Sequence, residues 1–65
     1  MTTKEATRWK MLQNYKEKGA QRAVEIGREM MHSSLYANDI KFKTDLHGEI
    51  TECILEILIR EEMRL

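Results

Sequence analysis

The sequence has 65 residues, enough for one small domain whose core supplies about 3–5 kcal/mol of stability at most. Its single cysteine excludes an intrachain disulfide, and no cysteine–histidine cluster has the spacing of zinc ligands. The net charge is zero, yet residues 1–32 carry seven basic and four acidic side chains, whereas residues 33–65 carry four and seven. This asymmetry indicates either two segments that pack against each other or a basic end offered to an acidic partner.

A long first helix is predicted from about residue 3 to about residue 33. Thr2 and Glu5 have the spacing of a capping box, and the sequence contains no proline that would stop the helix early. At the helical period, one face continues through Gly19 without a change of phase, which favours a single helix. The alternative is that Gly19 ends a first helix and that the chain has three helices. The apolar face comprises Trp9, Leu12, Tyr15, Ala20, Ala23, Ile26, Gly27, Met30 and Met31.

The helical pattern is lost over about residues 35–43, which are predicted to form a loop. Asn38 and Asp39 are typical turn residues. Ile40 and Phe42 alternate with lysines, which indicates a short extended segment that caps the end of a bundle. One short strand cannot form a sheet by itself, so the fold class remains all-α.

A second helix is predicted over about residues 44–64, with Thr44 as its N-cap. Its main apolar stripe comprises Leu46, Ile50, Cys53, Ile54, Ile57, Leu58 and Leu65. Leu55, Ile59 and Met63 are spaced four residues apart and form a second, narrower apolar line. Because a helix in a hairpin needs only one apolar face, the second line predicts a further neighbour.

These features together predict a helix–loop–helix hairpin that dimerises into a helical bundle. The first helix is about ten residues longer than the second, so its N-terminal end would overhang the hairpin. A two-fold homodimer would bury the second apolar line and part of the overhang, and it would expose the rest of the overhang twice, at its ends. The predicted dimer contacts are Ala20, Ala23, Gly27, Leu55, Ile59 and Met63.

The sequence contains no pattern typical of a catalytic, cofactor or metal site. His32 and His47 lack metal-ligand spacing, and Ser33 and Ser34 have no base or orienting acid at a recognisable distance in the sequence. The carboxylates Glu49, Glu52 and Glu56, together with Arg60, fall on the face predicted to meet solvent. We therefore expect no cofactor, no bound metal and no enzymatic activity.

The remaining function class is binding. We expect a protein-interaction module, a regulator or inhibitor of the kind encoded by bacteria and their phages. A cytoplasmic location is expected because no signal peptide or membrane-spanning run is visible. Trp9 would anchor an acidic protein partner, since tryptophan and arginine dominate binding hot spots. The alternative for Trp9 is burial in the core of the dimer. The alternative is nucleic-acid binding through the basic N-terminal half, with aromatic side chains stacked on bases. The predicted partner-binding residues are Arg8, Trp9, Leu12, Tyr15 and Lys16.

Overall fold

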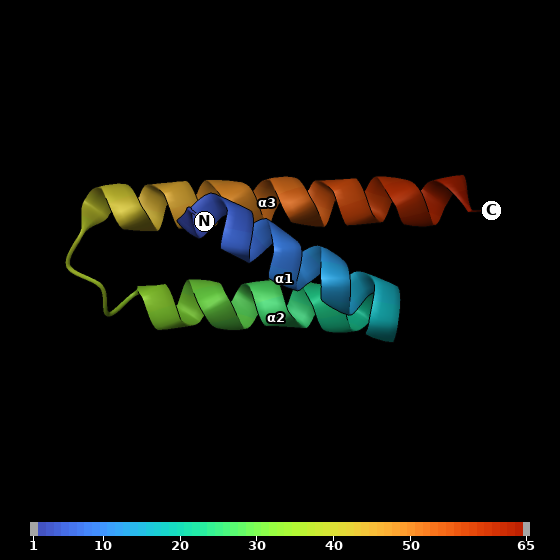
Figure 1. Ribbon diagram of the computed structural model, residues 1–65, viewed down its shortest axis with the longest axis horizontal. Coiled ribbons are helices and arrows are strands. Elements are labelled where there is room, and N and C mark those ends of the chain that lie inside the picture. Colours follow the sequence, from blue (N-terminus) through green and yellow to red (C-terminus); the bar gives the residue numbers. More distant parts are fainter. Residues whose placement is uncertain (1, 65) are drawn as a thin grey trace.

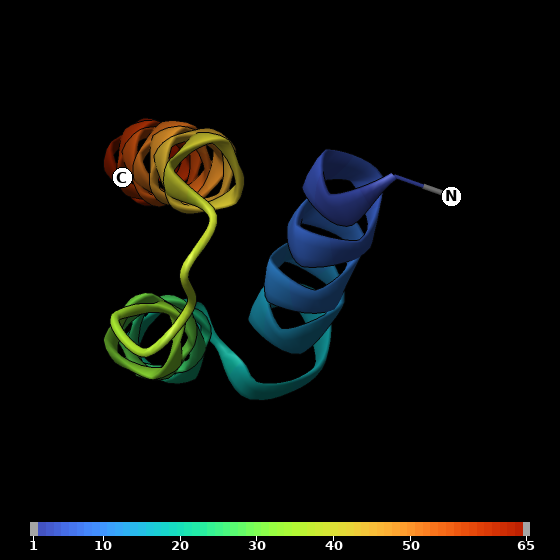
Figure 2. The same ribbon diagram turned by 90° about the vertical axis from the view of Figure 1, so that its left-hand side faces the viewer.

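The computed structural model describes residues 2–64, and its regular structure there is entirely α-helical. The three helices are α1 (Thr3–Lys18), α2 (Ala20–Ser34) and α3 (Ile40–Met63). Helices α2 and α3 run antiparallel, and α1 crosses diagonally over both (Figure 1). Seen end-on, the first turns of α1 lie level with α3 and its last turns lie level with α2 (Figure 2). The chain is thus a three-helix unit in which each helix contacts the other two.

The predicted single helix over residues 3–33 is wrong, and the three-helix alternative holds. Gly19 has φ +95° and ψ 172°, and the chain reverses direction there. Its N–H donates to the Tyr15 carbonyl at 3.0 Å, while its own carbonyl accepts from the Ala23 N–H at 3.2 Å. One glycine therefore ends α1 and begins α2.

The unbroken phase across Gly19 rested on placing Trp9 in the core. Trp9 is 63% exposed, and the buried side of α1 carries Thr7 and Met11 instead. Trp9 and Met11 lie about 160° apart on a helical wheel, so the core-facing phase does change between α1 and α2. The largest apolar side chain of α1, that of Trp9, is thus not part of the core.

The third helix begins at Ile40, four residues before the predicted start at Thr44. Asp39 is the N-cap, and its carboxylate accepts a hydrogen bond from the Phe42 N–H at 3.1 Å. The hydroxyl of Thr44 donates to the Ile40 carbonyl at 3.0 Å, inside the helix. The segment of residues 40–43, expected to be extended, is therefore helical. An aspartate N-cap followed by three turns of apolar periodicity is a stronger signal for a helix than a four-residue alternation is for a strand.

The core forms where the three helices meet. Gly27 of α2 allows the close approach that its position on the apolar face predicts, since a β-carbon there would lie 2.8 Å from Met11 Cε and 3.0 Å from Ile50 Cγ2. Leu58, expected in the core, is 51% exposed, and the predicted core residue Leu65 lies outside the described residues. The fully or nearly fully buried apolar side chains are Met11, Ala23, Ile26, Leu46, Ile50, Cys53 and Ile57.

The expected N-terminal overhang is absent from the described residues, since α1 folds back across α2 and α3. Helix α3 is the longest of the three, and its last turns extend beyond α1 and α2 (Figure 1). The C-terminal end of α3, and not the start of α1, is therefore the part of a helix that lacks a neighbouring helix among the described residues.

Candidate protein-binding surface

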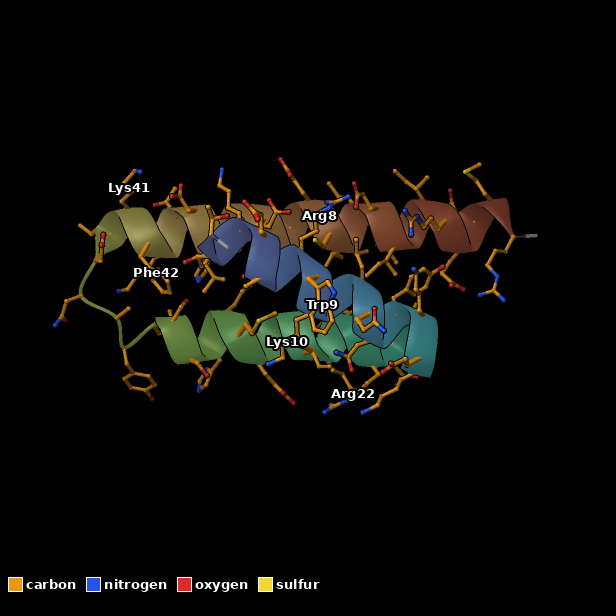
Figure 3. The ribbon with its side chains drawn as sticks, viewed as in Figure 1. Arg8, Trp9, Lys10, Arg22, Lys41 and Phe42 are labelled. Carbon is orange, nitrogen blue, oxygen red and sulfur yellow. The ribbon has the colours of Figure 1, made fainter. Side chains whose placement is uncertain are left out.

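The most exposed large aromatic side chain on a helix of this structure is Trp9, and it borders a shallow depression between α1 and α3. The depression has a volume of about 460 Å³. The spacing of Glu5, Trp9, Leu12 and Lys16 puts them on one side of α1, and Figure 3 shows the indole on this helix, which lies in front of the other two. We call the lining residues the Trp9 surface: Glu5, Arg8, Trp9, Leu12, Gln13 and Lys16 from α1, and Arg60 from α3.

Arg8 ties the Trp9 surface to α3. Its Nη2 lies 2.9 Å from Oε1 and 2.8 Å from Oε2 of Glu56, and its Nη1 lies 3.6 Å from Glu49. The hydrogen bond from Arg8 lowers the pKa of the Glu56 carboxyl and raises the pKa of the guanidinium. Glu49 and Glu56 were predicted to meet solvent, but they face α1 and hold Arg8 in one orientation.

Tyr15 lies one turn beyond Leu12 and forms a hydrogen bond with α3. Its hydroxyl donates to Glu61 Oε1 at 2.8 Å, which fastens the end of α1 to α3. That hydrogen bond also raises the pKa of the Tyr15 hydroxyl. Leu12 and Tyr15 both pack partly against the core. Four of the five predicted partner-binding residues thus line one depression, and Tyr15 supports it from the side.

Arg60 completes the Trp9 surface and could not be assigned to it from the sequence. It comes from α3, and only the packing of α1 against α3 brings it beside Lys16 and Trp9. Within residues 2–64, neither Lys16 nor Arg60 forms an ion pair with a carboxylate. The rim of the depression therefore offers two cationic groups that form no ion pair among the described residues, of which Arg60 lies close enough to Glu56 to add to the lowering of that carboxyl's pKa by Arg8.

The predicted dimer contacts separate into two sets. Ala23 and Gly27 are buried inside the chain's own core, and Ala20 packs partly against it. These small residues serve an intrachain contact, which corrects their assignment to a contact between chains. Leu55, Ile59 and Met63 are 55%, 56% and 80% exposed, and Leu58 extends the same patch.

A second, larger depression of about 610 Å³ lies between the helices near the α2–α3 loop. At its edge the Ser34 hydroxyl lies 2.6 Å from His47 Nε2 and donates to the Met31 carbonyl at 2.7 Å. The hydrogen bond between Ser34 and His47 fastens α2 to α3, and which of the two groups donates depends on the tautomer of the imidazole. The sequence separates these residues by 13 positions and gave no sign of their pairing.

No protein-family model, curated protein or solved structure matches this chain. In the part that the structure describes, no helix is both long and apolar enough to cross a bilayer. Among the same residues, no three histidine, cysteine, aspartate or glutamate side chains gather closely enough to hold a metal ion.

Proposed function

We propose that this protein is a protein-interaction module that regulates or inhibits another protein by binding it through the Trp9 surface, and that it acts as a homodimer. The observation that carries the proposal is the exposure of Trp9, 63%, at the edge of a depression with a basic rim. A tryptophan left in water forfeits the burial of a large apolar surface, which a partner can supply.

The charges around Trp9 favour an acidic protein surface. Lys16 and Arg60 stand beside the single carboxylate of Glu5, while the charge of Arg8 is paired with Glu49 and Glu56. Complementary charge of this kind steers association and selects the partner. Because Glu49 and Glu56 already hold the Arg8 side chain in one orientation, Arg8 loses less side-chain entropy when a partner covers the Trp9 surface.

Affinity capture from an extract of the native host tests this surface, with wild-type protein, Trp9→Ala and Tyr36→Ala as baits. Tyr36 is an 81% exposed aromatic in the α2–α3 loop, outside the Trp9 surface, and so is the matched control. A partner retained by wild type and Tyr36→Ala but lost with Trp9→Ala supports the proposal. Equal recovery on all three baits contradicts it.

The chemistry of the partner is tested by reversing one rim charge. Lys16→Glu should slow association with the captured partner at least several-fold at low salt, and the difference should shrink as salt screens it. A titration with random-sequence duplex DNA distinguishes nucleic-acid binding from the binding of an acidic protein. Affinity for DNA that falls steeply with salt would favour nucleic-acid binding through the basic N-terminal half.

The homodimer is supported by four exposed apolar side chains that lie together on α3, Leu55, Leu58, Ile59 and Met63, because a contiguous apolar patch is typical of an interaction site. Sedimentation equilibrium at micromolar concentration should return about twice the 7.7 kDa mass of the chain. A single species at the monomer mass contradicts this part of the proposal and leaves the Trp9 surface as a separate question.

A further inference from the structure

The outer face of α3 divides into a polar half and an apolar half. Along its first three turns this face carries Lys41, Asp45, Gly48 and Glu52 at helical spacing. Along its last three turns it carries four large apolar side chains, each more than half exposed, which we call the C-terminal stripe: Leu55, Leu58, Ile59 and Met63. Ile40, five turns before Leu58 on the same line of α3, is also 78% exposed, but it stands apart from the C-terminal stripe, whose four side chains lie together.

We infer that a second copy of this chain covers the C-terminal stripe, with the two α3 helices antiparallel about a two-fold axis near Ile59. This inference rests on the proposed homodimer and specifies its geometry. The axis brings Ile59 against Ile59 of the second copy and Leu55 to the level of Met63 of the second copy. A patch must be complementary to itself to form such an interface, and a line of apolar residues spaced four apart meets that requirement.

The distribution of charge favours the antiparallel arrangement. A parallel pair would bring each carboxylate on the outer face of α3, including those of Asp45 and Glu52, to the level of the same carboxylate in the second copy. Like charges placed together at an interface are unfavourable. The antiparallel pair overlaps only the C-terminal halves and leaves the polar halves in water.

The side of the stripe nearest α1 adds complementary charge. Glu56 and Arg60 lie on that side, and in an antiparallel pair the same sides of the two helices face each other. Arg60 of each copy therefore comes within about 3 Å, along the axis, of the level of Glu56 of the other copy. Arg60 forms no ion pair of its own in the part of the chain that the structure describes. Glu56 already binds Arg8 of its own chain at 2.8 Å, so in the dimer its carboxylate would be shared between Arg8 and Arg60 of the second copy, and Arg60 would border both the dimer contact and the Trp9 surface.

The size of the patch sets the expected strength. A stable interface buries about 800 Å² of surface on each partner. The four half-exposed side chains of the C-terminal stripe provide less surface than that. The neighbouring Thr51, Arg60 and Glu62 must contribute a polar rim, as interfaces of this size usually have. We therefore expect a reversible dimer that forms at micromolar concentration.

Spin labels on Lys41→Cys distinguish the possible arrangements. Lys41 has an 87% exposed side chain and lies 18 positions before Ile59 on the outer face of α3. Two labels should be about 54 Å apart in the antiparallel dimer and roughly 10–20 Å apart in a parallel one. Wild-type protein treated with the label in the same way controls for reaction at Cys53, which is fully buried.

Each result of that experiment has a defined meaning. A distance near 54 Å in a sample that sediments as a dimer supports the inference. A short distance in a dimer overturns the antiparallel geometry and leaves the proposed dimer standing. A sample that sediments as a monomer overturns both.

A pair of variants tests the location of the interface. Ile59→Glu should raise the dimer dissociation constant at least 100-fold, because it places two carboxylates at the axis. Lys41→Glu changes charge on the same face of α3 but outside the C-terminal stripe, and it should leave the dissociation constant within about three-fold. Circular dichroism confirms that both variants remain helical. If Ile59→Glu dimerises as tightly as Lys41→Glu, the interface lies elsewhere and the inference is overturned.

Discussion

Gly27 of α2 and Met11 of α1 are in contact at the centre of the molecule. A β-carbon on Gly27 would lie 2.8 Å from Met11 Cε and 3.3 Å from its sulfur. The Met11 side chain is fully buried, so it has little room in which to move away. Two helices thus approach closely because one of them has no side chain at the crossing point, and Ile50 of α3 fills the remaining space, 3.0 Å from the same β-carbon position.

Gly27→Ala should therefore lower the free energy of unfolding, even though alanine is the better helix former. The propensity gain of about 1 kcal/mol is opposed by overpacking, which typically costs about 1–3 kcal/mol. We expect a net loss on the order of 1 kcal/mol for alanine and a larger loss for Gly27→Leu, measured by urea denaturation.

Gly48→Ala is the matched control for that substitution. Gly48 is also inside a helix, but nothing lies within 4 Å of its β-carbon position. It should gain up to about 1 kcal/mol from propensity alone. If Gly27→Ala stabilises the protein as much as Gly48→Ala does, the contact with Met11 is looser than the structure indicates.

Gly19→Ala should destabilise the protein through backbone strain alone. No atom lies within 4 Å of the β-carbon position, so steric overlap with neighbouring side chains plays no part. The backbone angles, φ +95° and ψ 172°, belong to a region that is accessible essentially only to glycine, and the strain there is about 1–3 kcal/mol.

A chemically synthesised chain with D-alanine at Gly19 gives the opposite expectation. D-residues have mirror-image preferences, so these angles are unstrained for D-alanine. Its unfolded state is also less flexible than that of glycine, which favours folding. Thermal melts should rank D-alanine at or above glycine and L-alanine below both. Equal melting temperatures for the two alanine forms would mean that the chain does not turn at Gly19 as described.

The ion pair of Arg8 with Glu56 should make stability fall in acid. The pKa of Glu56 in the folded chain is lowered from its ordinary value of 4.5, chiefly by the hydrogen bond from Arg8. A lowered carboxyl pKa stabilises the fold above the unfolded-state pKa, and this contribution is lost as the pH falls through the lower, folded-state value. The loss should therefore appear below about pH 4.5.

Urea denaturation between pH 7 and pH 3 checks this dependence. Glu56→Gln should flatten the acid side of the stability profile, because glutamine does not titrate. Glu52→Gln removes a neighbouring exposed carboxylate that forms no ion pair within the described residues, and so serves as the control. If the two variants give the same profile, the pair with Arg8 does not contribute measurably.

The sequence predicted those features that depend on neighbouring residues in the chain. The Thr2 cap is confirmed by a 3.1 Å hydrogen bond from the Glu5 N–H, and the core side of α3 at Leu46, Ile50, Cys53 and Ile57 is confirmed. The all-helical class is also confirmed. In each case the cause is local, a capping side chain or an apolar period along one helix.

The features that the sequence did not reveal depend on packing between distant segments. Whether Gly19 turns the chain depends on which side of α1 meets α2 and α3, and Trp9 pointed to the wrong side. Arg60 joins the Trp9 surface, and Ser34 joins His47, only after the helices have packed. No residue spacing within one helix indicates such a contact between helices.

The contrast between Trp9 and Met11 gives the last prediction. Met11→Ala removes a fully buried side chain and should cost about 2–5 kcal/mol of unfolding free energy. Trp9→Ala removes a larger side chain that is 63% exposed, and it should change the unfolding free energy by less than about 1 kcal/mol. Trp9 is the only tryptophan, so intrinsic fluorescence reports its surroundings directly. Emission should be red-shifted and readily quenched by iodide in the free protein, and it should shift to the blue when a partner covers the Trp9 surface. A blue, unquenched emission in the free protein, or a Trp9→Ala loss as large as that of Met11→Ala, would mean that the indole is part of a core, either within the chain or between two copies.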